Sequence, residues 1–164
     1  MKITTLNVRG LNAPNKKIIL KQNLNKFESN IILLQETKLN KIEGINLGKK
    51  LGNWSITLQE VVGASRGLGF IWNHRKVTVD ILNVRNNWIS GTVKSLKSNL
   101  KFILVNFYGP TSNLEKKETW EEINIFMNDH KNSLILIGGD FNTIPNLNEK
   151  VGGTQQISQA SKEF

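Results

Sequence analysis

The stretch LILIGGDFN, residues 134–142, joins an apolar run to two polar side chains. Its first four residues are too few for a stable helix and are bounded by Gly138 and Gly139, which predicts a buried strand. Asp140 and Asn142 leave the end of that strand two residues apart, so they face the same side. A carboxylate there can accept a proton from water, and the neighbouring amide can hold the carboxylate or a substrate oxygen. An Asx turn that closes a strand would have the same pattern.

Three further apolar runs, residues 2–8, 31–34 and 102–107, also predict buried strands. Each run ends beside a polar residue that could bind a metal or a phosphate. Ligands collect beyond the carboxyl ends of strands in open sheets. The sequence therefore predicts that five residues converge on one site: Asn7, Glu36, Tyr108, Asp140 and Asn142.

Helical patterns lie between these predicted strands. Pro14 begins one helix between the first two apolar runs, and a second helix lies between the last two, with glutamates gathered in its first half. Their inward faces are predicted to carry Leu20, Leu24 and Phe27 in the first and Trp120, Ile123 and Met127 in the second. The middle of the chain differs, because β-branched and aromatic segments separated by short turns predict an antiparallel meander over residues 54–62, 67–72, 77–84 and 88–95. Mixed sheets covered by helices, an α+β architecture, are expected.

The amino-acid composition limits which catalytic groups and metal ligands the chain can use. The chain has 164 residues, 38% hydrophobic residues, no Cys and two His, which fits one globular domain without disulfides. Thiolate catalysis and structural zinc are excluded, and any metal needs oxygen ligands. No apolar run is long enough to span a membrane and no secretory signal is readable, so an intracellular protein that is not secreted is expected.

The net charge of +9 has two interpretations. It attracts polyanions through counterion release, which favours nucleic acid as a partner. Lysines make up 18 of the 22 cationic residues, and lysine spread along a chain also forms an ordinary solvated surface.

Four short motifs in order make the pattern specific: TLNVRGL at 5–11, QETK at 35–38, YGP at 108–110 and GDFN at 139–142. Together they resemble the endonuclease/exonuclease/phosphatase superfamily. The QETK and YGP motifs, together with GGDFNTIP at 138–145 and NEKVGG at 148–153, look most like the endonuclease domain of plant-type LINE (non-LTR) retrotransposons.

This resemblance implies a helix-flanked β-sandwich of the DNase I-like type that hydrolyses DNA phosphodiesters with Mg²⁺ or Mn²⁺. Glu36 would ligate the metal, and Asn7 would help to position the metal and the phosphate. Tyr108 would donate a hydrogen bond to the scissile phosphate. Asp140 would orient or deprotonate the attacking water, and Asn142 would hold Asp140 and stabilise the developing charge.

The chain departs from the family pattern in three places. Arg9 stands where many relatives carry an acidic or amide residue, and we interpret it as a cation facing phosphate or solvent. Residues 64–70 replace a glycine pair. The closing Ser-Asp-His motif has no match after Asn142, and neither His74 nor His130 replaces its histidine.

The resemblance therefore covers a C-terminally truncated domain. Residues 1–150 would be the N-terminal part of the family's domain, and residues 151–164 a polar tail or the start of a cut helix. An incomplete sandwich exposes apolar surface and strand edges, so we expect the isolated chain to be oligomeric or unstable.

Three functions stay open at this point. The first is a DNA endonuclease impaired by the missing Asp-His pair, acting in the nucleus, whose parent polypeptide would also carry a reverse transcriptase domain. The second is a catalytically inactive remnant that binds nucleic acid. The third is a phosphomonoesterase of the same superfamily.

Overall fold

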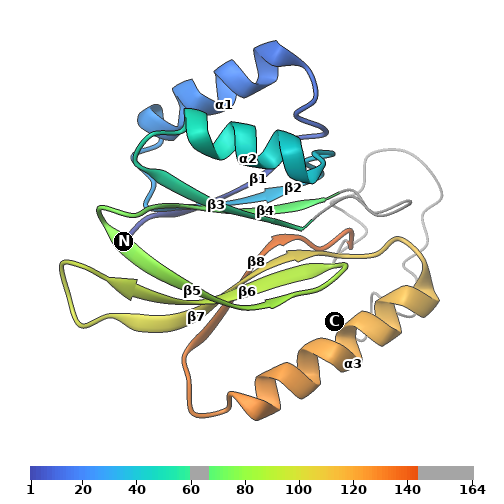
Figure 1. Cartoon of the computed structure of the whole chain (residues 1–164). Helices are drawn as coiled ribbons and strands as arrows, with labels where there is room; N and C mark the ends of the chain where they lie inside the picture. The colour runs from blue at the N-terminus through green and yellow to red at the C-terminus, as the bar shows by residue number, and fades with distance from the viewer. Residues whose placement is uncertain (60–66, 144–164) are drawn as a thin grey trace, which may run out of the picture.

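Two four-stranded sheets stack face to face, with helices on both outer faces (Figure 1). The computed structural model describes residues 1–59 and 67–143. The first sheet has the order β1-β2-β4-β3 and the second β5-β6-β7-β8. The first half of the chain contains β1 (Ile3–Asn7), α1 (Pro14–Lys26), β2 (Ile31–Gln35), α2 (Lys41–Lys50), β3 (Trp54–Gln59) and β4 (Leu68–Asn73). The second half contains β5 (Val77–Val84), β6 (Trp88–Ser95), β7 (Lys101–Tyr108), α3 (Asn113–Asp129) and β8 (Ile135–Asp140).

The predicted helix-flanked β-sandwich is confirmed. Each end of the described chain is a strand-helix-strand unit: β1 pairs parallel with β2 after α1, and β7 pairs parallel with β8 after α3. Helices α1 and α2 cover the first sheet, and α3 covers the second (Figure 1).

The predicted single meander over the middle strands is wrong. Strands β3 and β4 form an antiparallel pair in the first sheet, whereas β5 and β6 form one in the second. The chain changes sheets between Asn73 and Val77. Local alternation of residues reveals a strand but not its sheet, because pairing depends on distant partners.

Strand β2 shows why the core has two layers. Its residues are all buried, and alternate side chains face opposite ways. Ile32 and Leu34 pack under α1 and α2, whereas Ile31 and Leu33 pack between the two sheets. A strand covered on both faces reads as a continuous apolar run, and each such side chain contributes about 1.5 to 3 kcal/mol when fully buried.

Helix α2 was missing from the predicted elements, although its N-terminus has a recognisable signal. The Asn40 side chain accepts a hydrogen bond from the Glu43 backbone, and the Glu43 carboxylate accepts one from the Asn40 backbone, which forms a capping box. Gly44 lets the helix approach β3 closely, because a Cβ there would overlap Leu58.

Leu20 and Leu24 of α1 lie in the core as predicted, whereas Phe27 follows the helix as its C-cap and is only half-buried. Pro14 is the first residue of α1, and the inward face of α3 packs Trp120, Ile123 and Met127 on the second sheet. Within residues 1–59 and 67–143, no helix is long and apolar enough to cross a membrane. Predicted features at 60–66 and 144–164, which include the altered glycine motif up to Arg66 and the boundary at residue 150, lie outside the described residues.

Candidate active site

Four strands bring polar residues to one edge of the sandwich. Asn7 ends β1, and Glu36 follows β2, where Asn7 pairs with Gln35. Tyr108 ends β7 and Asp140 ends β8, and these two residues are direct neighbours in the parallel ladder. Register therefore places these strand ends side by side in pairs, one pair in each sheet.

The Asn7 side chain lies between the two acidic groups. Its Nδ2 donates to Glu36 Oε1 at 2.9 Å and to Asp140 Oδ2 at 2.8 Å. Its Oδ1 accepts from the Arg9 backbone N–H at 3.1 Å, which orients the amide. One nitrogen thus gathers two carboxylates and offsets part of their mutual repulsion, because hydrogen bonds to ionised groups are the stronger kind.

Tyr108 and Asn142 complete the cluster. The Tyr108 side chain is 8% exposed, and its hydroxyl donates to Glu36 Oε1 over a long 3.4 Å. The Asn142 backbone N–H donates to Asp140 Oδ1 at 3.1 Å, and its Nδ2 donates to the Gly109 carbonyl at 2.6 Å. The structure therefore joins all five predicted site residues in one hydrogen-bonded group, while their individual roles remain predictions.

Backbone geometry at the site requires particular residues. Glu36 and Asn142 adopt left-handed φ values of 55° and 48°, which few residues other than glycine occupy and which cluster at functional sites. The Gly10 N–H donates to the Glu36 carbonyl at 2.6 Å and holds that turn. A Cβ on Gly109 would overlap the Phe141 backbone, and one on Gly139 would overlap the Phe107 backbone. Gly109 of YGP and Gly139 of GGDFN thus let the backbones of β7 and β8 lie close to each other at the site.

Three supporting residues were not predicted. Gln35 donates to Asn106 Oδ1 at 2.6 Å in the interior, and both side chains are almost fully buried. Lys116 is 7% exposed, and its Nζ donates to the Asn142 carbonyl at 3.2 Å. A sequence signal existed for Lys116, because it lies on the same helical face as Trp120 and Ile123.

Neither histidine belongs to this site, as the sequence predicted. His74 follows β4, which runs antiparallel to β2, so it lies at the sheet edge where β2 begins. His130 caps the end of α3 before β8 starts, and its Nδ1 contacts the Phe126 carbonyl at 2.9 Å. Arg9 is exposed two residues after Asn7, which is consistent with a cation that faces phosphate or solvent.

The donor chemistry fits a hard divalent cation. Among the described residues, no three His, Cys, Asp or Glu side chains group as a metal cage. Glu36 and Asp140 instead provide two carboxylates gathered on one amide. Mg²⁺ is held in proteins by one or two carboxylates together with water and substrate phosphate oxygens. Glu36 and Asp140 could therefore hold such an ion.

A groove of about 830 Å³ begins beside the site. Tyr108, Pro110 and Thr111 form its near end, and the loop with Arg85 and the first turns of α3 form its walls. Three glutamates of α3 also line the groove, Glu115, Glu118 and Glu122, and Tyr108 is the member of the candidate site that it reaches.

Comparisons with known proteins agree with this architecture. The profile of the Endonuclease/Exonuclease/phosphatase family matches residues 4–155. No curated protein sequence matches the chain.

Three solved structures illustrate the likeness in fold. The endonuclease domain of TRAS1, a telomere-specific non-LTR retrotransposon, has a TM-score of 0.67 and 13% identity over 97% of this chain and 66% of that one. The human Nocturnin catalytic domain with bound sulfate has a TM-score of 0.66 and 14% identity, covering 85% of this chain and 63% of its own. The mannosyl-6-phosphatase Bt3783 of Bacteroides thetaiotaomicron has a TM-score of 0.65 and 14% identity, covering 99% and 68%. The chain thus spans about two thirds of the length of each.

Proposed function

The chain belongs to the endonuclease/exonuclease/phosphatase family, and we propose that it hydrolyses phosphodiester bonds of DNA. The observation that carries the proposal is the single Asn7 amide that holds Glu36 and Asp140 at the converging strand ends. A pair of positioned carboxylates can serve both of the needs of phosphate ester hydrolysis, which are a cation near the phosphate and a base for water.

Glu36 would hold Mg²⁺ or Mn²⁺ through its carboxylate, and Asn7 would help to position the ion and the phosphate. The ion, when bound, supplies a Lewis acid for the phosphoryl group. The left-handed turn at Glu36 and the Gly10 contact keep that carboxylate at the site edge.

Asp140 is the proposed base. Donors from Asn7 and from the Asn142 backbone occupy both of its oxygens and fix the plane of the carboxylate. In hydrolysis Asp140 would take a proton from water as the water oxygen bonds to phosphorus. The bond from phosphorus to the leaving sugar oxygen breaks, and that oxygen takes a proton from solvent. Tyr108 would donate to a phosphate oxygen, and Asn142 would hold Asp140 and stabilise the developing charge.

Several features support DNA as the substrate. The net charge of +9 favours a polyanion, and Arg9 adds an exposed cation beside Asn7. The sequence resemblance to plant-type LINE endonucleases and the fold likeness to the TRAS1 domain point the same way. On this proposal the chain acts in the nucleus, and a parent polypeptide would also carry a reverse transcriptase domain.

A second candidate is phosphomonoester hydrolysis at the same site. The likeness in fold to a mannosyl-6-phosphatase is as good as the likeness to the nucleases. A third candidate is a protein that binds nucleic acid without turnover, which the net charge of +9 would suit equally well.

Nicking of supercoiled plasmid in Mg²⁺ tests the proposal, with EDTA as a metal-free control. Asp140→Asn keeps the size of the side chain but removes the base, and we expect a rate lower by about 10²-fold or more. Asp80→Asn is the matched control, because Asp80 is an exposed carboxylate on β5 paired only loosely with Lys94 at 3.6 Å. Circular dichroism confirms that both variants fold.

Each outcome selects one candidate. Nicking that needs metal and is lost only in Asp140→Asn supports the endonuclease. Equal nicking by Asp140→Asn and the wild type refutes the assigned base. A folded chain that binds DNA in a salt-sensitive way without nicking is the inactive remnant, and cleavage of a sugar phosphate without nicking indicates the phosphatase.

A further inference from the structure

The outermost layers of the molecule carry opposite charges. Helices α1 and α2 contain seven lysines and one glutamate, whereas α3 contains five acidic residues and two lysines. These layers lie at opposite ends of the stack of helices and sheets (Figure 1). Positive and negative charges are therefore separated onto opposite outer layers, although the chain as a whole has a net charge of +9.

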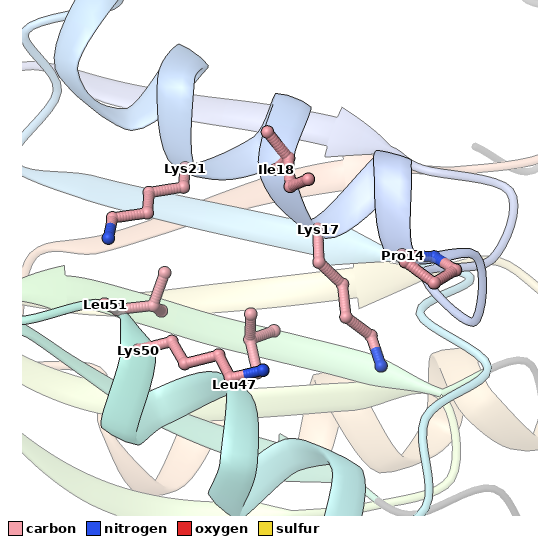
Figure 2. A pocket seen from close by; sticks show the side chains of 7 residues that line it. All are labelled: Pro14, Lys17, Ile18, Lys21, Leu47, Lys50 and Leu51. Carbon is pink, nitrogen blue, oxygen red and sulfur yellow. The ribbon is translucent and has the colours of Figure 1, made fainter.

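An apolar groove of about 500 Å³ lies between α1 and α2. Leu47 and Leu51 line it and are only 3% and 5% exposed, whereas Ile18 is 60% exposed. Three lysines that line the same groove extend between the two helices in Figure 2: Lys17, Lys21 and Lys50. We call these residues the helix groove.

The lysines of the helix groove leave positive charge available. Lys17 already reaches Glu43 at 3.8 Å. Within the described part of the chain, neither Lys21 nor Lys50 forms an ion pair. The groove thus offers apolar surface beside positive charge, which suits an acidic, amphipathic segment.

The outer face of α3 has the complementary pattern. Leu114 and Ile125 are 70% and 62% exposed, and Glu118 and Glu121 lie between them at helical spacing on the same face. The opposite side of α3 buries Ile123 and its neighbours against the second sheet. The outer face therefore combines apolar ends with a central negative charge.

We propose that the outer face of α3 of one copy docks in the helix groove of a second copy. Ile125 or Leu114 would contact Ile18 and the buried leucines, and Glu118 and Glu121 would lie near Lys21 and Lys50. Because the two surfaces are different and lie at opposite ends of one molecule, the contact is heterologous and does not close as a dimer. Copies would add head to tail, and the catalytic edge would stay at the side of the stack.

The contact is small, so we expect dissociation constants on the order of tens of micromolar. In sedimentation velocity, the average sedimentation coefficient of the 164-residue chain should rise with concentration past the value expected for a dimer. Raising the ionic strength from about 0.05 M to about 0.5 M should weaken the association, because the charges lie at the surface.

Two substitutions at exposed positions separate the surfaces. Ile18→Glu adds a negative charge to the helix groove, and Ile125→Glu adds one to the outer face of α3. Each should weaken self-association about tenfold or more, since burial of one isoleucine is worth that much in a binding constant. Leu96→Glu is the matched control, because Leu96 is 54% exposed in the turn between β6 and β7.

A mixture of the two variants is the decisive measurement. Only the α3 of the Ile18→Glu chain and the groove of the Ile125→Glu chain remain intact, so the mixture should form a 1:1 complex that grows no further. A chain that stays monomeric at low salt overturns the proposal and leaves the groove to another acidic partner. Association that resists both substitutions, or that stops at a dimer in the wild type, also overturns it. None of these association measurements depends on nuclease activity, so their outcome is independent of the proposed function.

Discussion

Replacement of Asn106 by alanine tests how the two sheets are joined above the site. Asn106 lies in β7 of the second sheet and is fully buried. Its Nδ2 donates to the carbonyls of Leu34 at 3.0 Å and of Gly69 at 2.9 Å, both in the first sheet. Its Oδ1 accepts from Gln35, which directly precedes Glu36.

Asn106→Ala removes these three hydrogen bonds in the interior. Each hydrogen bond contributes about 1 kcal/mol net, so the free energy of unfolding should fall by about 3 kcal/mol. That is a large part of the roughly 5 to 15 kcal/mol available to a domain, and for a chain of this size it lowers Tm by about 6 to 12 °C.

Urea unfolding followed by tryptophan fluorescence and circular dichroism measures the loss. Asn106→Asp keeps the volume but points a carboxylate at two carbonyls, so it should destabilise at least as much as alanine. Asn128→Ala, at an exposed position on α3, should change stability by less than about 0.5 kcal/mol. The reasoning is refuted if Asn106→Ala lowers the free energy of unfolding by less than about 1 kcal/mol. It is also refuted if Asn106→Asp unfolds at the same urea concentration as the wild type.

Two further substitutions follow from the local geometry. Gly139→Ala places a Cβ against the Phe107 backbone at a φ of 153°, so the free energy of unfolding should fall by at least about 2 kcal/mol. A smaller change in urea unfolding means that β8 can shift away from β7. Asn40→Ala removes the capping box of α2, so the free energy of unfolding measured by thermal unfolding should fall by about 1 kcal/mol. Asn46→Ala, inside the same helix, is the control and should not destabilise the protein. Equal effects of the two substitutions would contradict the role of the cap.

Much of the fold was predictable because its signals are local. The four apolar runs that end at Asn7, Glu36, Tyr108 and Asp140 became strands, and register places their ends together in pairs within each sheet. Helix α2 was missed because it contains two glycines, which are poor helix formers, and few apolar residues. The capping box at its start was the available signal.

The sequence by itself determined which side chains form the candidate site, because each one follows an apolar run or lies in a short motif. Only the tertiary structure decided how they meet. The Asn7 amide reaches Asp140 across 133 positions of the chain, and the assignment of β3 and β4 to one sheet and β5 and β6 to the other depends on equally distant pairings. The separation of the basic helices from α3 has the same origin, since local patterns specify an element and its faces, whereas long-range packing specifies its neighbours.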